Sequence, residues 1–235
     1  MASVLISGDT SGSITISAPA VSGTNTLTLP VATDTLVGLA ATQTLTNKTL
    51  TSPVLTTPNL GTPSTLVLTN ATGLAAASLP AGSVLQVVSA NMTSALAMGM
   101  SGWTSISGWA ATITPSSTSN KVLVLGFCGA VSGASNTQAI RILRGATAIA
   151  VGDASGSRSQ ATTRGARHGD SNHTYSSSSF SCLDSPSSSS AVTYQIQGLT
   201  EGNSTLYINR SQNDTDTFTY GARTCASLTL MEIKA

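Results

Sequence analysis

Residues 44–70 read TLTNKTLTSPVLTTPNLGTPSTLVLTN, an alternation of Thr or Ser with Leu or Val that is interrupted by Pro53, Pro58 and Pro63. Alternating β-branched and apolar residues favour an extended backbone with one apolar face. Because proline fixes φ and lacks an amide donor, an ordinary central strand does not accept one every five residues. A single copy of this stretch therefore has apolar side chains to bury and no sheet in which to bury them.

Three copies of the stretch, wound around a common axis, would bury these side chains against one another. We therefore predict that residues 41–83 form an intertwined fibre shaft. The side chains predicted to face the trimer axis are Leu50, Leu55, Leu60 and Leu66.

The same region resembles a known class of protein. Residues 26–53, TLTLPVATDTLVGLAATQTLTNKTLTSP, look like the shaft-forming region of bacteriophage tail fibre and related virion fibre proteins. Residues 227–233, SLTLMEI, resemble the closing strand of the globular knobs that end such fibres. The resemblance covers residues 24–66 and the terminal strand, and between them only composition and layout are shared. It implies a homotrimer with a host-binding role.

The charged residues are few and unevenly placed. They make up 8% of the chain, against about 25% in typical soluble proteins. Residues 1–120 contain only Asp9, Asp34 and Lys48, and every other ionisable side chain lies at Lys121 or later. The first aromatic residue is Trp103. This shift in composition predicts an extended N-terminal arm followed by a globular C-terminal domain.

Within that division, Gly and Pro residues suggest finer boundaries. Ala90–Met100 favours a weak helical turn, and the tryptophans at 103 and 109 flank a Ser/Gly-rich loop, where they either anchor a core or stack on a sugar. Short strands are predicted at 13–17, 26–30 and 84–88. The predicted regions are a virion-attachment region (1–40), the shaft (41–83), a connector (84–112) and a globular knob (113–235).

The C-terminal half has the pattern of an antiparallel β-domain. Lys121–Phe127 is a nearly continuous apolar run, which suits a strand buried on both faces. Val192–Gln197 alternates strictly between apolar and polar residues. Further strands are predicted at 138–143, 146–151, 175–183, 205–209 and 226–233. The predicted fold class is all-β: an extended N-terminal trimeric fibre shaft followed by an antiparallel jelly-roll-like β-sandwich knob.

Two loops between the predicted strands, residues 155–173 and 211–218, carry the densest hydrogen-bonding side chains of the knob. Receptors commonly bind such loops on a rigid scaffold, and arginine suits the carboxylate or sulfate of an anionic surface glycan. The alternative is a solvated loop without a specific role. The candidate receptor-binding residues are Arg158, Arg164, Arg167, His168, Asp170, His173, Asn213 and Asp214.

Other chemistries have little support in the sequence. His168, Asp170 and His173 form the only cluster with metal-ligand character. No partner that would orient these ligands can be identified from the sequence, and their Gly/Ser-rich setting is typical of a flexible loop, so we expect no metal and no cofactor. The chain lacks a Gly-x-Ser-x-Gly nucleophile elbow, and we expect no enzymatic activity. A net charge of +1 argues against a nucleic-acid partner. No apolar run approaches the roughly 20 residues that span a bilayer, so no membrane insertion is expected.

The cysteines and the N-terminus bear on where the protein is assembled. Cys128, Cys182 and Cys225 are odd in number and widely spaced, which favours buried free thiols in a reducing cytoplasm. The first residues, MASVLISGDTSG, lack the basic and long apolar regions of a secretory signal. We therefore expect assembly in the host cytoplasm and a final location in the virion.

Together these features predict a bacteriophage tail fibre that attaches to the virion by its N-terminal region and mediates host adsorption through its C-terminal knob. The expected partners are two further copies of the chain, a tail or baseplate protein, and a host cell-surface glycan or protein. The alternative is a trimeric capsid decoration protein, which would stabilise or decorate the phage head.

Overall fold

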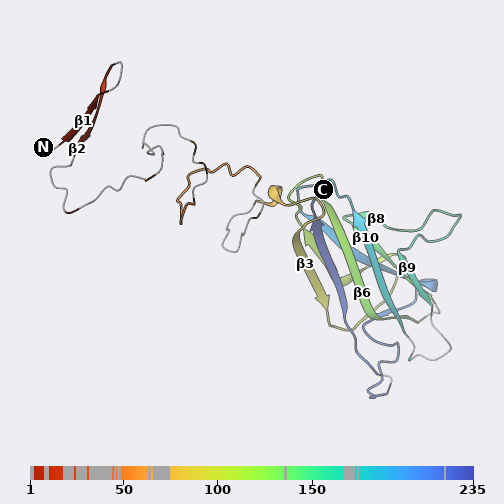
Figure 1. The fold of residues 1–235 in the computed structure, drawn as a ribbon. Coiled ribbons are helices and arrows are strands. Elements are labelled where there is room, and N and C mark those ends of the chain that lie inside the picture. The colour runs from red at the N-terminus through yellow and green to blue at the C-terminus, as the bar shows by residue number, and fades with distance from the viewer. Residues whose placement is uncertain are drawn as a thin grey trace. The chain divides into compact units, whose positions relative to one another are not determined.

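The computed structural model describes residues 3–7, 11–17, 24, 31, 44, 46, 49–62, 65, 75–134, 137–166, 173, 175–219 and 221–235. The chain divides into two compact units, Met1–Val67 and Leu68–Ala235 (Figure 1). The described elements are strands with two short 3₁₀ helices, so the all-β fold class is confirmed. They are β1 Ser3–Ser7, β2 Ser13–Ser17, η1 Ala76–Ser78, β3 Val84–Met92, β4 Leu96–Met98, β5 Thr104–Ile113, β6 Lys121–Gly133, β7 Thr137–Arg144, β8 Thr147–Ile149, β9 Thr163–Ala166, β10 Ser176–Asp184, β11 Val192–Thr200, η2 Glu201–Asn203, β12 Leu206–Ile208 and β13 Ala226–Ile233.

The first unit contains one hairpin and one extended segment among its described residues. β1 and β2 pair antiparallel, which confirms the strand predicted at 13–17. Residues 49–62 contain no helix or strand, and Leu50, Leu55 and Leu60 are exposed in the single chain. The strand predicted at 26–30 and the fourth axis residue, Leu66, lie outside the described residues.

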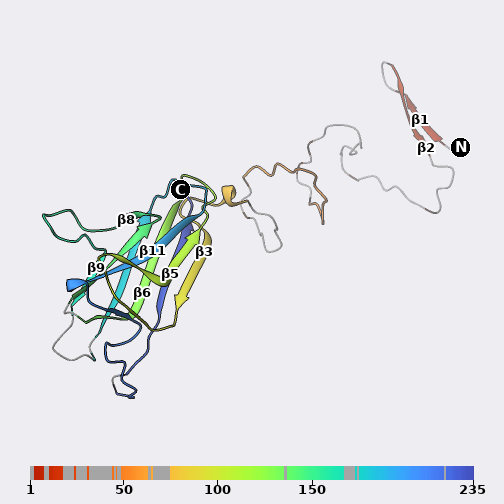
Figure 2. The same cartoon turned by 180° about the vertical axis from the view of Figure 1, so that it is seen from behind.

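The second unit consists of two antiparallel sheets. The first sheet has six strands: its order is β3-β13-β6-β12-β4, and β10 also pairs with β6. The second sheet has the order β5-β11-β7-β8, and β9 also pairs with β7. Figures 1 and 2 show the two sheets from opposite sides. The strands predicted at 84–88, 121–127, 138–143, 146–151, 175–183, 192–197, 205–209 and 226–233 correspond to β3, β6, β7, β8, β10, β11, β12 and β13.

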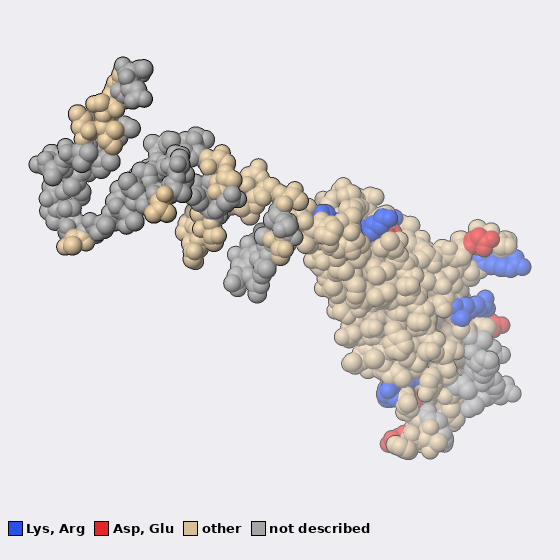
Figure 3. All heavy atoms as spheres, viewed as in Figure 1, with Lys and Arg blue, Asp and Glu red and all other residues tan. Residues whose placement is uncertain are grey.

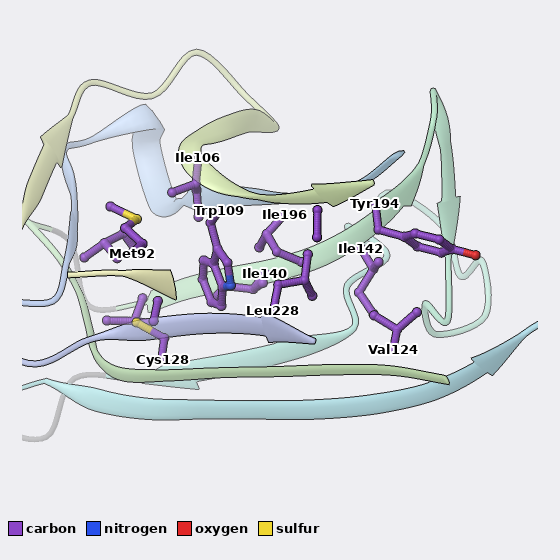
Figure 4. Close-up of a cluster of buried hydrophobic side chains, with 14 of the residues drawn as sticks. Met92, Ile106, Trp109, Val124, Cys128, Ile140, Ile142, Tyr194, Ile196 and Leu228 are labelled. Atoms are coloured by element: carbon purple, nitrogen blue, oxygen red, sulfur yellow. The ribbon is translucent and has the colours of Figure 1, made fainter. Parts of the chain in front are cut away.

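A single hydrophobic core lies between the two sheets (Figure 4). Alternate residues of each strand enter it, as the period of two in a strand requires. The first sheet contributes residues such as Val124 and Leu228, and the second contributes residues such as Ile142, Ile196 and Trp109. All five are fully buried.

Trp109 anchors this core through both its ring and its nitrogen. Its indole Nε1 donates to the Ser227 carbonyl oxygen at 3.0 Å, and its ring centroid is 6.1 Å from that of Phe180. The Phe180 ring lies over Gly126, where a Cβ atom would be only 2.0 Å from the ring. Of the two roles considered for Trp109, the structure therefore supports the core anchor.

The upstream boundary of the β-domain differs from the sequence prediction. Residues 84–112, predicted as a connector, contain β3, β4 and most of β5, and all three strands belong to the two sheets. Ala90–Met100 contains the end of β3 and all of β4, so the helical turn predicted there is wrong. Pairing of β3 with β13 and of β4 with β12 supplies the backbone hydrogen bonds that a helix would otherwise make.

One carboxylate is buried where β3, β13 and the loop after β5 meet. Glu232 is only 1% exposed. Its oxygens accept hydrogen bonds from Gln86 Nε2 (2.6 Å), Asn120 Nδ2 (2.6 Å), and the Ser116 backbone N–H (2.6 Å) and hydroxyl (2.7 Å). Burial by itself would raise the pKa of Glu232, but these hydrogen bonds together outweigh burial and lower the pKa below its ordinary value.

We expect Glu232→Gln to destabilise the fold by about 2 kcal/mol at pH 7, because the amide nitrogen would face donors that need an acceptor. Since the folded-state pKa is lowered, the carboxylate stabilises the fold above its unfolded pKa of about 4.3 and stops doing so as pH falls through the folded value. Urea unfolding should be measured at pH 7 and at steps down to pH 3. The difference in unfolding free energy between the variant and the parent chain should shrink as the pH falls. Asp153→Asn, at an exposed position, is the matched control, and a pH-independent difference for Glu232→Gln would contradict the assignment.

Candidate functional site

A pocket of about 460 Å³ opens on the outer face of the second sheet. That volume is within the range of small-ligand sites, roughly 300–1,000 Å³. Its floor is a cross-strand row, because Ala139 of β7 pairs with Leu199 of β11 on one side and with Arg164 of β9 on the other. Ser159 and Ala161, in the segment between β8 and β9, form a wall. We call this site the Arg164 pocket.

The polar groups of the Arg164 pocket meet at one hydroxyl. Arg164 Nη2 is 3.3 Å from Thr137 Oγ1, which is 3.4 Å from Glu201 Oε2. The Thr137 hydroxyl, which can donate and accept hydrogen bonds, therefore lies between the Arg164 guanidinium, which only donates, and the Glu201 carboxylate, which only accepts. Among the described lining residues Arg164 and Glu201 carry the charges, one of each sign, and Ala139, Ala161 and Leu199 provide the apolar surface.

An aromatic ring lies beside this pocket on the same face. Trp103 directly precedes Thr104, which pairs with Gly198 next to Leu199 of the pocket floor. The guanidinium of Arg141 lies 4.4 Å from the centroid of the Trp103 indole and donates to Gln197 Oε1 at 2.9 Å. Trp103 is half-buried, and sugar stacking at this residue stays a prediction.

Beneath the floor, on the core side of the same strands, is a second and much smaller cavity of about 20 Å³. Gln138 and Ser178 both line it. In the described part of the chain, the buried Oε1 of Gln138 and Oγ of Ser178 have no hydrogen-bond partner. A cavity of this size holds one water molecule. A water molecule there would hydrogen-bond to both polar atoms, and the two cavities adjoin, because Gln138 and Arg164 line both of them.

The first predicted receptor loop is only partly described. Arg158 and Arg164 make different contacts: Arg164 lines the pocket, whereas Arg158 donates to Ser155 Oγ at 2.9 Å within a turn. Figure 1 shows the segment between β8 and β9 extending away from the sheets. His173 is half-buried. Arg167, His168 and Asp170 lie outside the described residues.

The second predicted loop, between β12 and β13, is braced by one of its own candidates. Asp214 pairs with Arg223 and, at 3.2 Å, with Arg210. Arg210 also donates to the backbone oxygens of Ser211 (3.0 Å) and Gln212 (2.9 Å). The predicted neighbour Asn213 is exposed. Asp214 is thus used within the loop, and its receptor role stays a prediction.

The first sheet presents an apolar outer face. Cross-strand pairs place Val87, Met231, Leu123 and Leu183 in one row across β3, β13, β6 and β10. Val87 and Leu183, at the two ends of the row, are each 55% exposed. The surface of the knob seen in Figure 3 is mostly free of charged atoms, which lie near its margins. We call this row and the neighbouring Val84, Leu125, Phe127 and Ile233 the apolar face.

The apolar face also shows where one strand prediction was incomplete. Lys121–Phe127 was expected to be buried on both faces. Only the inward residues, such as Val122 and Val124, are buried in one chain, while Phe127 on the outer side is 44% exposed. The sequence run is continuous because its second face is apolar as well, although nothing within the described chain covers that face.

The described residues also bear on metal binding, membrane insertion and disulfide formation. No cluster of three or more potential His, Cys, Asp or Glu metal ligands occurs among the described residues. The helices described here are too short to cross a bilayer. All three cysteines are free thiols; Cys128 is buried as predicted, whereas Cys182 is half-buried and Cys225 is exposed.

Among the residues of the Arg164 pocket that were absent from the predicted receptor residues are the polar side chains of Thr137 and Glu201. Glu201 and Thr137 are 64 positions apart and meet only because β7 and β11 are neighbours in the sheet. A strand end followed by an acidic residue, as at Leu199–Thr200–Glu201, was the only local signal for this site. Among the predicted receptor residues that the structure describes, Arg164 is the one that lines the pocket.

We expect Asp214→Asn to open the β12–β13 loop, because Arg210 and Arg223 would lose their shared carboxylate. Loss of about 1 kcal/mol of local stability raises the open population roughly fivefold. Trypsin cleavage after Arg210 and Arg223 should therefore accelerate by about that factor. Asp216→Asn, at an exposed position in the same loop, should leave the rate unchanged; equal rates for the two variants would show that Asp214 does not brace the loop.

No protein-family model and no curated protein sequence matches this chain. The functional assignment therefore depends on the two surfaces described above, the Arg164 pocket and the apolar face, together with the shaft-like sequence of residues 44–70.

Proposed function

We propose that the protein is a trimeric virion fibre of a bacteriophage, in which the N-terminal region attaches to the virion and the C-terminal knob adsorbs to the host surface. The observation that carries this proposal is the apolar face. Four apolar side chains form an uninterrupted row across four strands, and the other rows of this face contain Ser, Thr, Asn, Leu, Val, Ile and Phe with Lys121 as the one charge. Large exposed apolar patches mark interaction surfaces.

The dimensions of the apolar face suit contact between protein subunits. Four strands about 4.8 Å apart and eight residues long at about 3.4 Å per residue span roughly 500 Å². A standard interface covers about 800 Å² per partner, and the shaft would add to the contact. Because the face carries almost no charge, a second copy can approach it without desolvating ion pairs.

The extended segment of the first unit supports the same proposal. Leu50, Leu55 and Leu60 recur at five-residue intervals and are exposed. The backbone repeats with the same period: Ser52 and Thr57, each directly before a proline, have φ values of 49° and 48°. Positive φ is unfavourable for a β-branched residue such as Thr57. A repeating conformation of this kind needs external support, which neighbouring chains in a shaft would provide.

We also infer that the knob is a jelly roll. Two four-strand paths support this topology, β3-β13-β6-β10 in the first sheet and β5-β11-β7-β9 in the second. Consecutive long strands alternate between these sheets, as the crossing connections of a double Greek key require. In a trimer joined through the apolar face, the second sheet and its Arg164 pocket would face outward, where a host surface molecule could reach them.

The full chain should sediment as a homotrimer, and Val87→Glu combined with Leu183→Glu should raise its dissociation constant at least tenfold. Both side chains are already half-exposed, so the substitutions leave the core intact. In the trimer they would bury charge in an apolar contact. Sedimentation equilibrium over a dilution series measures the change.

The matched control is Ser107→Glu, at an exposed position of β5 in the second sheet, which should leave the trimer unchanged. A folded monomer of the full chain would overturn the trimeric fibre, and equal behaviour of the double variant and the control would exclude the apolar face as the contact.

Antibody labelling of intact particles separates the two virion roles: label at the tail or baseplate supports a fibre, and label over the shell supports a capsid decoration protein.

A further inference from the structure

We propose that the Arg164 pocket binds an uncharged saccharide unit, with the sugar ring on its apolar floor and the hydroxyls on its polar rim. The proposal rests on the host-surface role given above and names the ligand class of the knob. It differs from the sequence-based expectation of an anionic glycan, because the pocket places a carboxylate beside the arginine.

The shape and apolar groups of the pocket fit a sugar ring. Ala139, Ala161 and Leu199 provide an aliphatic floor and wall in a cavity of about 460 Å³. The carbon-bound hydrogens of a pyranose form apolar patches, and contact with aliphatic side chains removes them from water. Trp103, next to Leu199 through the Thr104–Gly198 pair, extends this surface for a second sugar unit.

The polar groups fit vicinal hydroxyls. A sugar hydroxyl both donates and accepts, so one hydroxyl can accept from Arg164 while its neighbour donates to Glu201. Thr137, between these two side chains, can do either. A ligand carboxylate, in contrast, only accepts, and would place a second negative charge close to Glu201. The pocket therefore selects against uronic acids, and binding of its neutral ligand depends little on salt.

Saturation-transfer NMR on the full chain tests this with matched probes: the methyl glycosides of glucose, galactose and mannose, and the corresponding uronates. At least one neutral glycoside should bind, with an affinity at least tenfold above that of its uronate and unchanged between 0.05 M and 0.5 M NaCl. Arg164→Gln should abolish that binding. Glu201→Gln should reduce the difference in affinity between the neutral sugar and its uronate. Arg158→Gln, a control outside the pocket lining, should change neither.

The proposal is overturned if no neutral glycoside binds, if a uronate binds better to the parent chain, or if Arg158→Gln has the same effect as Arg164→Gln. These results are independent of assembly. A trimer that binds none of the sugars would refute the pocket assignment alone, whereas a monomer that binds a neutral sugar would refute the fibre and retain the pocket.

Discussion

The structure of the second unit depends on one constraint, that two sheets share a single core. Each strand has two faces, and alternate residues from both sheets must enter the same interior. Trp109, Phe180 and Gly126 show how closely that interior is packed, since one ring occupies the space that a Cβ at position 126 would need. Burial of these faces fixes the orientation of every remaining side chain on the long strands, and so determines the composition of the two outer faces.

Those outer faces differ in chemistry, and the difference separates the two proposed roles. The outer side of the first sheet carries the Val87–Met231–Leu123–Leu183 row, which suits contact with another copy of the chain. The outer side of the second sheet carries hydrogen-bonding groups such as Arg141, Gln197 and Arg164. Assembly and ligand binding would therefore use opposite sides of one domain, and neither would obstruct the other.

The low charge content gives the few ionisable groups of the knob defined structural positions. Glu232 joins β3, β13 and the loop after β5, and Asp214 braces the loop before β13. Asp184 accepts hydrogen bonds from Arg144 (2.8 Å) and Tyr194 (2.7 Å). A charged residue in this chain is therefore poor evidence by itself for a binding role, as Asp214 illustrates.

The sequence alone determined most strands of the knob, whereas β4, β5 and β9, the last inside the predicted receptor loop 155–173, were not predicted. Alternation over stretches such as Val192–Gln197 is a local property, and burial of one face preserves it in the fold. The sequence also indicated that residues 44–70 and Lys121–Phe127 carry apolar side chains that need to be buried. It did not indicate whether a sheet of the same chain or a neighbouring chain covers these side chains. The β-domain began earlier than predicted because β3, β4 and β5 find their partners far along the chain.

Only the tertiary structure decided which polar residues meet. Arg158 and Arg164 are close in sequence, yet one bonds within a turn and the other lines a pocket. Thr137, Arg164 and Glu201 come together through the pairing of β7 with β9 and β11. The physical reason is that strand periodicity is a short-range property of the chain, whereas sheet neighbours are chosen by which arrangement buries the shared core. A pocket between sheet neighbours therefore leaves almost no trace in the local sequence.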